Sequence, residues 1–280
     1  MDSLGVNRRT REAMVAGIFY PDDPTMLAER VGTALSGYEA SSDSPSATRP
    51  MAILSPHAAF DYSCDVQAAA WASTAGAKLD RVIILAPLLR ADDHGVYLPE
   101  TEVFQTPLGD IEVDSGACAD LESCNTLFIV NDIPHFESHA IEIQLPFMKT
   151  LFPEALLVPI LVSGDKVIVQ NLARAIGMVF GDDMDRTLIV ASSNLASSIL
   201  RPDAAERSKD LLDLIKSGDW KSLCAQKDVV GLAAIASVMA SHVIQDTHFQ
   251  LLAYDDSHKQ ASSTSEGIVH YAAAAWYGGE

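Results

Sequence analysis

Basic residues are scarce in this chain of 280 residues. Lys and Arg number 19 against 38 Asp and Glu, giving a formal net charge of −19 at pH 7. Nucleic-acid grooves and anionic membrane surfaces bind clustered Lys and Arg, so we expect neither as a partner. Long apolar runs are also absent, because the clean run Ala155–Val162 is far shorter than the ~20 residues of a membrane-spanning helix.

Cysteine is rare as well, and its spacing excludes the common zinc folds. The four thiols form no CxxC pair and fit no zinc finger or ribbon: Cys64, Cys118, Cys124 and Cys224. Scattered thiols in a chain of this size are typical of reduced core residues. No apolar signal segment follows the basic stretch Arg8–Arg11, so we expect a cytoplasmic protein.

Several catalytic and phosphate-binding motifs are missing. The chain has no GxGxxG after a strand and no GxxxxGK[ST], so dinucleotide and P-loop sites lack their phosphate cradles. It has no GxSxG, which removes the usual α/β-hydrolase nucleophile. His135 and His139 form an HxxxH pair, but Phe136 stands where the HExxH zinc motif needs Glu.

The shortage of bases is most marked between Arg90 and Lys149, where no Lys or Arg occurs. Twelve acids lie in this stretch, from Asp92 to Glu142. We expect a solvated acidic face that aids solubility, with an electrostatic funnel for a cation as the alternative.

Apolar β-branched runs alternate with amphipathic segments, and the 48% hydrophobic content excludes general disorder. The runs predict strands at Met51–Leu54, Val82–Ala86, Leu127–Val130, Leu156–Leu161, Leu188–Ala191, Leu251–Tyr254 and Ile268–Ala275. Because runs such as Val82–Leu85 do not alternate, the strands are expected to be buried on both faces of a largely parallel sheet.

Helices are expected between these strands, beginning with Pro24–Leu35, which Asp23 would cap. The others are Asp65–Ser73, Ser115–Glu122, Lys166–Phe180, Ala204–Lys216 ending at Gly218, and Gly231–Val243. This order predicts an α/β fold, a three-layer αβα sandwich with a mostly parallel central sheet. The polar stretches Glu39–Arg49 and Asp255–Glu266 are read as loops, so residues 1–280 are expected to form one domain.

Candidate site residues follow the predicted strands, where sites of α/β sheets form. His57, held by Pro56, follows the first strand and suits a metal or an acid–base role, or a local turn. Ser192, Ser193 and Asn194 follow another strand and suit a cleft floor or a helix N-cap.

Two further segments carry candidates. After the strand Val82–Ala86 the corresponding position is Leu89, and His94 follows in a loop, where a surface histidine is the simpler interpretation. His139, Glu142 and Gln144 are interleaved with apolar residues and, when buried, need hydrogen-bond partners. We expect a polar network there, either structural or part of a pocket.

Together these residues resemble the Memo family, also known as AmmeMemoRadiSam system protein B. Arg11–Pro21 resembles the family's R-x-P-x-V-A-G-x-F-Y-P, and Ile53–Phe60 resembles I-x-P-H-A-G-Y. Phe104–Asp110 is similar to F-x-T-P-L-G-D, His139–Phe147 to H-S-I-E-V-Q-L-P-F, and Val158–Val162 to the strand that follows. The resemblance covers nearly the whole chain. It implies a fold similar to the class III extradiol, LigB-type dioxygenases, and a pocket in which iron or copper is bound.

Carried over residue by residue, the resemblance keeps only part of that metal site. His57 and His139 match family histidines. Leu89 stands in place of the histidine of G-P-S-H, and Asn194 and Ser197 in place of the Asp and His of S-S-D-F-x-H. Ser138 replaces the Glu of E-H-S, and Val230 replaces the Cys of C-G. Two imidazoles without a carboxylate would hold Fe(II) poorly.

Three hypotheses follow for the function. The first is a divergent Memo-family protein that has largely lost its metal site, has no cofactor, and binds a small molecule or a protein. The second is a metal-dependent oxidoreductase or dioxygenase-like enzyme, with iron or copper at a site rebuilt around His57 and His139 from His94, His135 or Glu142. The third is metal-free acid–base catalysis by the two histidines. The resemblance also implies a functional link to radical-SAM and AMMECR-type proteins.

Overall fold

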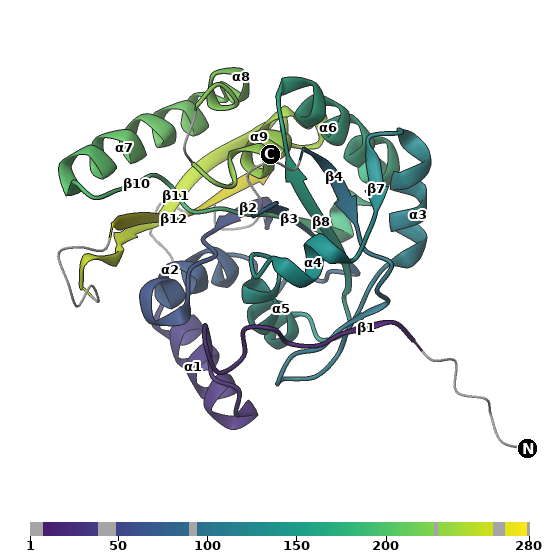
Figure 1. Ribbon diagram of the computed structural model, residues 1–280, viewed down its shortest axis with the longest axis horizontal. Coiled ribbons are helices and arrows are strands. Elements are labelled where there is room, and N and C mark those ends of the chain that lie inside the picture. Colours follow the sequence, from purple (N-terminus) through teal and green to yellow (C-terminus); the bar gives the residue numbers. More distant parts are fainter. Residues whose placement is uncertain (1–7, 39–48, 90–93, 227–228, 260–266, 279–280) are drawn as a thin grey trace, which may run out of the picture.

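A large twisted sheet runs through the computed structural model, which describes residues 8–38, 49–89, 94–226, 229–259 and 267–278. Within these ranges, nine strands form this sheet in the order β10-β12-β2-β9-β3-β8-β4-β7, with β11 beside β12 (Figure 1). They are β2 (Pro50–Ser55), β3 (Arg81–Pro87), β4 (Gly95–Leu98), β7 (Phe128–Val130), β8 (Leu156–Ser163), β9 (Thr187–Ser192), β10 (Ser197–Ser198), β11 (Thr247–Asp256) and β12 (Ile268–Gly278). A small second sheet joins β1 (Thr10–Arg11), β5 (Val103–Phe104) and β6 (Ile111–Glu112).

The four central strands β2, β9, β3 and β8 are mutually parallel, whereas β12 and β4 join them antiparallel. In the register of β2 and β9, Ser55 lies opposite Ser192. The carboxyl ends of these two strands therefore finish at the same edge of the sheet. This edge is where open α/β sheets place their ligands.

Helices cover both faces of the sheet. They are α1 (Pro24–Gly37), α2 (Phe60–Ala72), α3 (Ser115–Cys124), α4 (Ile133–Glu137), α5 (Leu145–Leu151), α6 (Lys166–Phe180), α7 (Arg201–Ser217), α8 (Trp220–Leu223) and α9 (Leu232–Ala240), with 3-10 turns at Glu142–Gln144, Gly181–Arg186, His242–Ile244 and Ser257–Lys259. In Figure 1, α1, α2 and α5 lie on one side of the sheet, and α6, α7 and α9 lie on the other. The chain is thus a three-layer αβα sandwich, as the alternation of runs predicted.

The core explains why the central strands read as unbroken apolar runs. Residues 82–86 of β3 are fully buried, because β8 and β9 flank the strand and helices cover both of its faces. All seven predicted strands are present, with ends that differ by a few residues. The structure contains no described helix with the length and apolar character of a membrane span.

The helix predictions were mostly right at their capped ends. Asp23 caps α1 by accepting a hydrogen bond from the Met26 amide at 2.9 Å, and Gly218 ends α7 in a left-handed conformation, with φ 76°. α2 begins at Phe60, earlier than the predicted Asp65, because Ala59 precedes it without any side-chain cap to mark the start. The predicted helix Gly231–Val243 is interrupted after Ala240.

The two predicted loops were partly misread. β11 continues through Asp256 and a 3-10 turn follows it, so the stretch Asp255–Glu266 begins in regular structure. Its remainder, residues 260–266, lies outside the described residues, as does most of the predicted loop Glu39–Arg49. The two-residue strands β1, β5, β6 and β10 were not predicted, because two residues are too short to show a period.

Candidate functional site

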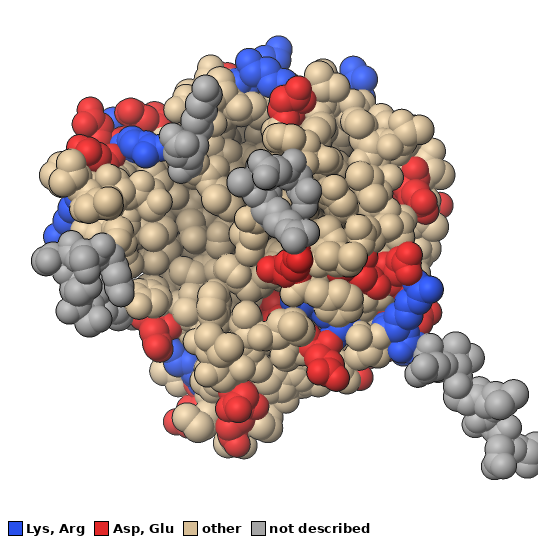
Figure 2. All heavy atoms as spheres, viewed as in Figure 1, with Lys and Arg blue, Asp and Glu red and all other residues tan. Residues whose placement is uncertain are grey.

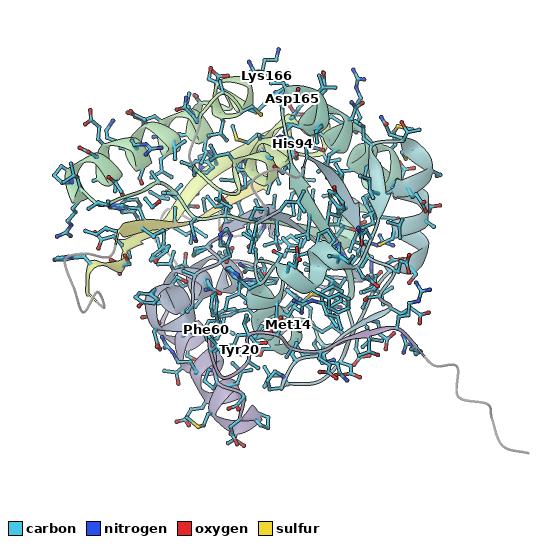
Figure 3. The ribbon with its side chains drawn as sticks, viewed as in Figure 1. Met14, Tyr20, Phe60, His94, Asp165 and Lys166 are labelled. Carbon is cyan, nitrogen blue, oxygen red and sulfur yellow. The ribbon has the colours of Figure 1, made fainter. Side chains whose placement is uncertain are left out.

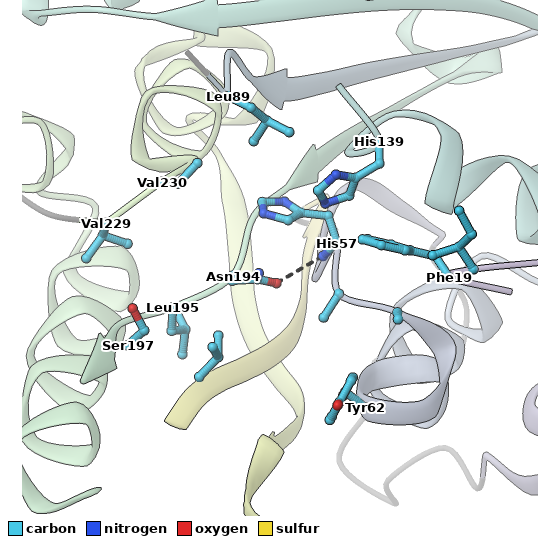
Figure 4. Close-up of a pocket in the computed structure, with 14 residues that line it drawn as sticks. Phe19, His57, Tyr62, Leu89, His139, Asn194, Leu195, Ser197, Val229 and Val230 are labelled. Carbon is cyan, nitrogen blue, oxygen red and sulfur yellow. Dashed lines mark hydrogen bonds between the residues drawn. The ribbon is translucent and has the colours of Figure 1, made fainter. Parts of the chain in front are cut away.

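A pocket of about 530 Å³ opens at the carboxyl ends of β2 and β9 (Figure 4). Its wall is mostly apolar and, among the described residues, contains no Lys, Arg, Asp or Glu. Figure 2 shows that charged side chains on the face in view lie mainly around its margin, away from the hollowed middle. The lining residues are Ile18, Phe19, His57, Ala58, Ala59, Tyr62, Leu89, His139, Asn194, Leu195, Ser197, Val229, Val230 and Val269.

His57 lies at the floor of this pocket, directly after β2, and is only 4% exposed. The Asn194 side chain fixes its backbone, since Asn194 Oδ1 accepts a hydrogen bond from the His57 amide at 3.0 Å. The ring Nδ1 is buried and has no hydrogen-bond partner among the described residues. Burial, reinforced by the neighbouring His139, lowers the pKa of His57 to about 3, so the imidazole is neutral at pH 7.

His139 stands beside His57, with ring centroids 5.8 Å apart and the planes nearly perpendicular. On its other side the Phe19 ring is 4.5 Å away, centroid to centroid. Burial lowers the pKa of His139, although Glu142 acts in the opposite direction. The pocket floor therefore presents two adjacent neutral imidazoles, and Figure 4 shows both rings facing the same space.

Four positions at which the sequence departs from the family motifs lie on the wall of this same pocket. They are Leu89, Asn194, Ser197 and Val230. Leu89 is 38% exposed and Val230 is 53% exposed, so both present hydrocarbon to the cavity mouth. The fold thus brings together residues from three distant segments that the motif comparison had singled out separately.

Glu142, predicted as a pocket residue, does not line the cavity but is fully buried behind it. Its carboxylate accepts hydrogen bonds from Arg11 Nη1 at 2.7 Å and from the Tyr20 hydroxyl at 2.8 Å. It also accepts bonds from the amides of Met14 and Val15. Glu142 therefore fastens the N-terminal segment that carries Ile18 and Phe19, because one carboxylate satisfies four of its donors.

Gln144 and Ser192, also predicted as pocket residues, form a brace under the floor. Gln144 Oε1 accepts a bond from Trp71 Nε1 at 2.9 Å, and Gln144 Nε2 donates to the Pro56 carbonyl at 2.8 Å and to Ser192 Oγ at 3.2 Å. The Ser192 hydroxyl donates in turn to the Ala140 carbonyl at 2.7 Å. The predicted polar network is confirmed for Glu142 and Gln144, and the bonds of Gln144 and Ser192 tie β2, β9 and α2 together.

Ser193 fixes the opposite wall. Its single hydroxyl proton is shared between the carbonyl oxygens of Asn194 and Val230, which lie 2.9 and 3.3 Å from Oγ. Gly231 follows Val230 in a left-handed conformation, with φ 103°, and a Cβ there would lie 2.3 Å from Ser193 Oγ. Only glycine fits this contact, which places Val230 at the cavity.

The structure does not bring the other candidate metal ligands to the histidine pair. His94 is exposed just before β4, and Figure 3 places it beside Asp165 and Lys166, well away from Tyr20 and Phe60. His135 is buried elsewhere, against the Phe104 ring and the Tyr97 carbonyl. Burial lowers the pKa of His135 to about 4.

The described residues offer a poor donor set for a non-haem metal. No group of three or more His, Cys, Asp or Glu in the described ranges is arranged to hold an ion. At the pocket only two imidazoles remain, and the amide oxygen of Asn194 is engaged by the His57 backbone. Fe(II) sites use two histidines and a carboxylate, and this pocket has no carboxylate or thiolate among its lining residues.

Every described acid of the acidic stretch is at least partly exposed except Glu142, which is buried. Arg8 pairs with Glu112 and Arg9 with Glu100, both on the surface, and Glu142 is buried against Arg11. The scarce bases near the N-terminus therefore lie along the base-free stretch and neutralise part of it (Figure 2). Arg90, Asp92 and Asp93 lie outside the described residues.

Much of the pocket wall was not predicted from the sequence. Ile18 and Phe19 come from the N-terminal motif, Tyr62 comes from α2, and Val269 comes from β12. The motif Arg11–Pro21 was the available signal for the first two. Nothing in the local pattern marked Tyr62 or Val269, since both read as ordinary apolar positions.

Comparison with known proteins identifies the family. A family model described as Memo-like protein matches residues 11–275. A MEMO1 family protein of Nitrosopumilus maritimus is 25% identical over 272 residues, covering 94% of this chain and 98% of the relative. One of Desulfurococcus amylolyticus is 27% identical over 283 residues (96% and 99%), and one of Thermotoga petrophila is 30% identical over 224 residues (76% and 79%). The chain therefore belongs to the Memo family.

Proposed function

We propose that this protein is a divergent, non-catalytic member of the Memo family whose pocket binds a small uncharged molecule instead of a metal ion. The observation that carries the proposal is the composition of the pocket wall. Leu89 and Val230 stand where the family resemblance implies a histidine and a thiolate, and both side chains line the cavity beside His57. Hydrocarbon at those points supplies no lone pair for a metal.

The electrostatics of the pocket support an uncharged ligand. The described lining has no charged side chain to pair with an anion or a cation, and burying an unpaired charge is costly. The low pKa of His57 keeps the floor neutral at physiological pH. The apolar body of such a ligand would pack against the pocket walls, and one polar group would form a hydrogen bond with an imidazole. Small-molecule sites commonly combine apolar walls with a few polar groups in this way.

Ligand-observed NMR with a panel of small aromatic and alicyclic compounds tests this proposal. The panel contains matched neutral, anionic and cationic members of each scaffold. We expect neutral members to bind, and we expect Val230→Glu to weaken them about tenfold or more, because it places a carboxylate at the cavity mouth. Val167→Glu, at a 60% exposed position on α6, is the matched control and leaves binding unchanged.

Two results would count against the proposal. Selective binding of charged members would mean that a charge outside the pocket wall controls the pocket. Equal affinities of wild type and Val230→Glu would place the ligand elsewhere.

The alternative function is a metal-dependent oxidoreductase or dioxygenase-like enzyme, with iron or copper held by His57 and His139. It requires a third ligand, and His94, His135 and Glu142 lie elsewhere in the structure. Oxygen uptake on a catechol panel after anaerobic Fe(II) loading would favour this alternative. Acid–base catalysis by His57 is disfavoured at pH 7, because a base with a pKa of about 3 accepts a proton poorly. A link to radical-SAM and AMMECR-type proteins stays a prediction.

A further inference from the structure

The outer edge of β11 has no strand partner within the described part of the chain. β11 pairs along its inner edge with β12, and the sheet ends there. At the other end of the sheet, β7 has only three residues. Very short edge strands are one way in which proteins avoid joining other sheets, and β11, with ten residues, lacks this protection.

Most of β11 lacks the charged side chains that protect other sheet edges, because its only acids, Asp255 and Asp256, lie at its C-terminal end. Thr247–Asp256 contains no Lys, Arg or Pro, the residues that commonly block edge pairing. None of its ten residues is fully buried, and Leu251 and Tyr254 are 45% and 42% exposed. In Figure 1, β11 and β12 run side by side between α7 and α2; α2 contacts both strands, and α7 contacts β12.

A bulge decides which side chains share a face. Leu251 pairs with Ala274, but Ala253 pairs with the very next residue, Ala273, so β11 contains one extra residue. Phe249 and Tyr254 consequently pair with Trp276 and Ala272, which lie on the same face of β12. In a regular strand, residues five apart would point to opposite faces.

The same shift applies to the other face. His248 and Asp255 pair with Tyr277 and Tyr271, which again share one face of β12. His248 and Asp255 are seven residues apart, an odd separation that a regular strand would also split between faces. The bulge therefore gives β11 a two-fold pattern about its centre, with an aromatic pair on one face and a His–Asp pair on the other.

We propose that β11 pairs with the β11 of a second copy of this chain, antiparallel about a two-fold axis between Leu251 and Leu252. In this register Phe249 lies opposite the partner's Tyr254, and His248 lies opposite the partner's Asp255. Each contact occurs twice, as an isologous interface requires. Cross-strand aromatic pairs and cross-strand pairs of opposite charge both stabilise antiparallel strand pairing. The two large sheets then become one continuous sheet.

The self-complementary pattern favours a second copy over an extended peptide from another protein. A peptide ligand would need a matching sequence, whereas β11 already presents that sequence to itself. Monomers that bind an unrelated extended segment would overturn the proposal, because the edge would then have a different occupant.

Sedimentation velocity of the full chain over a range of concentrations tests the interface. We expect a reversible dimer for wild type, and Leu251→Lys weakens it at least tenfold, because two lysines then meet near the axis. Met178→Lys, at a 74% exposed position on α6, makes the same chemical change elsewhere and leaves the dimer intact. A wild-type monomer at all concentrations, or a dimer that Leu251→Lys does not weaken, would overturn the proposal.

The register has its own test. His248→Asp places carboxylates opposite Asp255 across the axis and weakens the dimer, and adding Asp255→His restores it, with circular dichroism confirming that each variant is folded. After mixing His248→Cys protein with Asp255→Cys protein and adding a chemical oxidant, we expect a cross-linked heterodimer. Failure of both the rescue and the cross-link would overturn this register and with it the proposed pairing.

Discussion

Glu142 is the residue on which the position of the pocket's N-terminal wall depends. It is fully buried, and it pairs with Arg11, which is 1% exposed, more than a hundred residues earlier in the chain. Removing one member of a buried ion pair leaves the other charge buried without a partner, which typically costs about 3–5 kcal/mol. We therefore expect Glu142→Ala to lower the free energy of unfolding by about that much in urea titrations.

Two controls define this effect. Glu12→Ala removes an exposed carboxylate from the same segment and should change stability little. Glu142→Gln keeps the shape and part of the hydrogen bonding, and so should fall between the two. If Glu142→Ala were as stable as Glu12→Ala, Glu142 would not fasten the wall.

The buried histidines make stability depend on pH. The pKa of His57 is about 3 in the folded protein, below its ordinary value of 6.5, so the unfolded chain binds the proton more readily. The contribution of His57 to the free energy of unfolding is therefore fully present above about pH 6.5. It is lost as the pH falls toward 3, by up to about 1.4 kcal/mol per pH unit. His135, with a pKa of about 4, acts in the same direction.

Urea unfolding of wild type and His57→Asn at pH 7, 6 and 5 checks this dependence. We expect the variant to lose less stability on acidification, because it lacks one of the buried imidazoles that resist protonation in the folded protein. His94→Asn, at an exposed position away from the pocket, should follow wild type. Parallel pH curves for wild type and His57→Asn would contradict the assignment.

For single residues, the sequence predicted which side chains lie at the site better than what each of them does there. His57, His139, Leu89 and Asn194 were singled out from strand ends and motifs, and they meet in one pocket. Glu142 and Gln144 were recognised as needing partners, but those partners come from distant segments. No local pattern could show whether they faced the cavity or supported it.

Among the elements, the start of α9 holds the Val229–Val230 wall through Gly231. Its φ of 103° is unfavourable for any residue with a Cβ, and the Ser193 hydroxyl occupies the space that a Cβ would need. Gly231→Ala should therefore cost more than the ~1–2 kcal/mol of left-handed strain alone. Thermal and urea unfolding measure the loss.

Gly218→Ala provides the matched control at the end of α7. Gly218 has φ 76°, and a Cβ added there would meet no atom within 4 Å, so only the strain applies. Equal losses at the two glycines would show that the Ser193 contact is not tight.

Helices and strands could be predicted where burial or a capping residue leaves a clear pattern in the sequence. The central strands are covered on both faces and show as unbroken apolar runs, and α6 has the predicted bounds Lys166–Phe180, with Asp165 as its cap. The start of α2 at Phe60 has no capping side chain, so only tertiary packing sets it. The bulge in β11 depends on pairing with β12 and leaves no mark in the sequence.

For the whole molecule, the acidic composition does not determine the chemistry of the pocket. The acidic stretch, with twelve of the 38 acids, is partly balanced by Arg8, Arg9 and Arg11, and no acid lines the described pocket wall. The layered α/β architecture followed from the alternation of runs. The central functional claim, that this pocket no longer holds a metal, depends on a few side chains that the whole fold brings together.

Anaerobic titration with Fe(II) and Cu(I), followed by metal analysis of the separated protein, tests that claim most directly. The proteins compared are wild type, His57→Ala, and the triple variant Leu89→His/Asn194→Asp/Val230→Cys, whose new donors would line the same pocket. We expect no stoichiometric metal in wild type or His57→Ala, and a bound ion in the triple variant. A stoichiometric ion in wild type that His57→Ala abolishes would contradict the account.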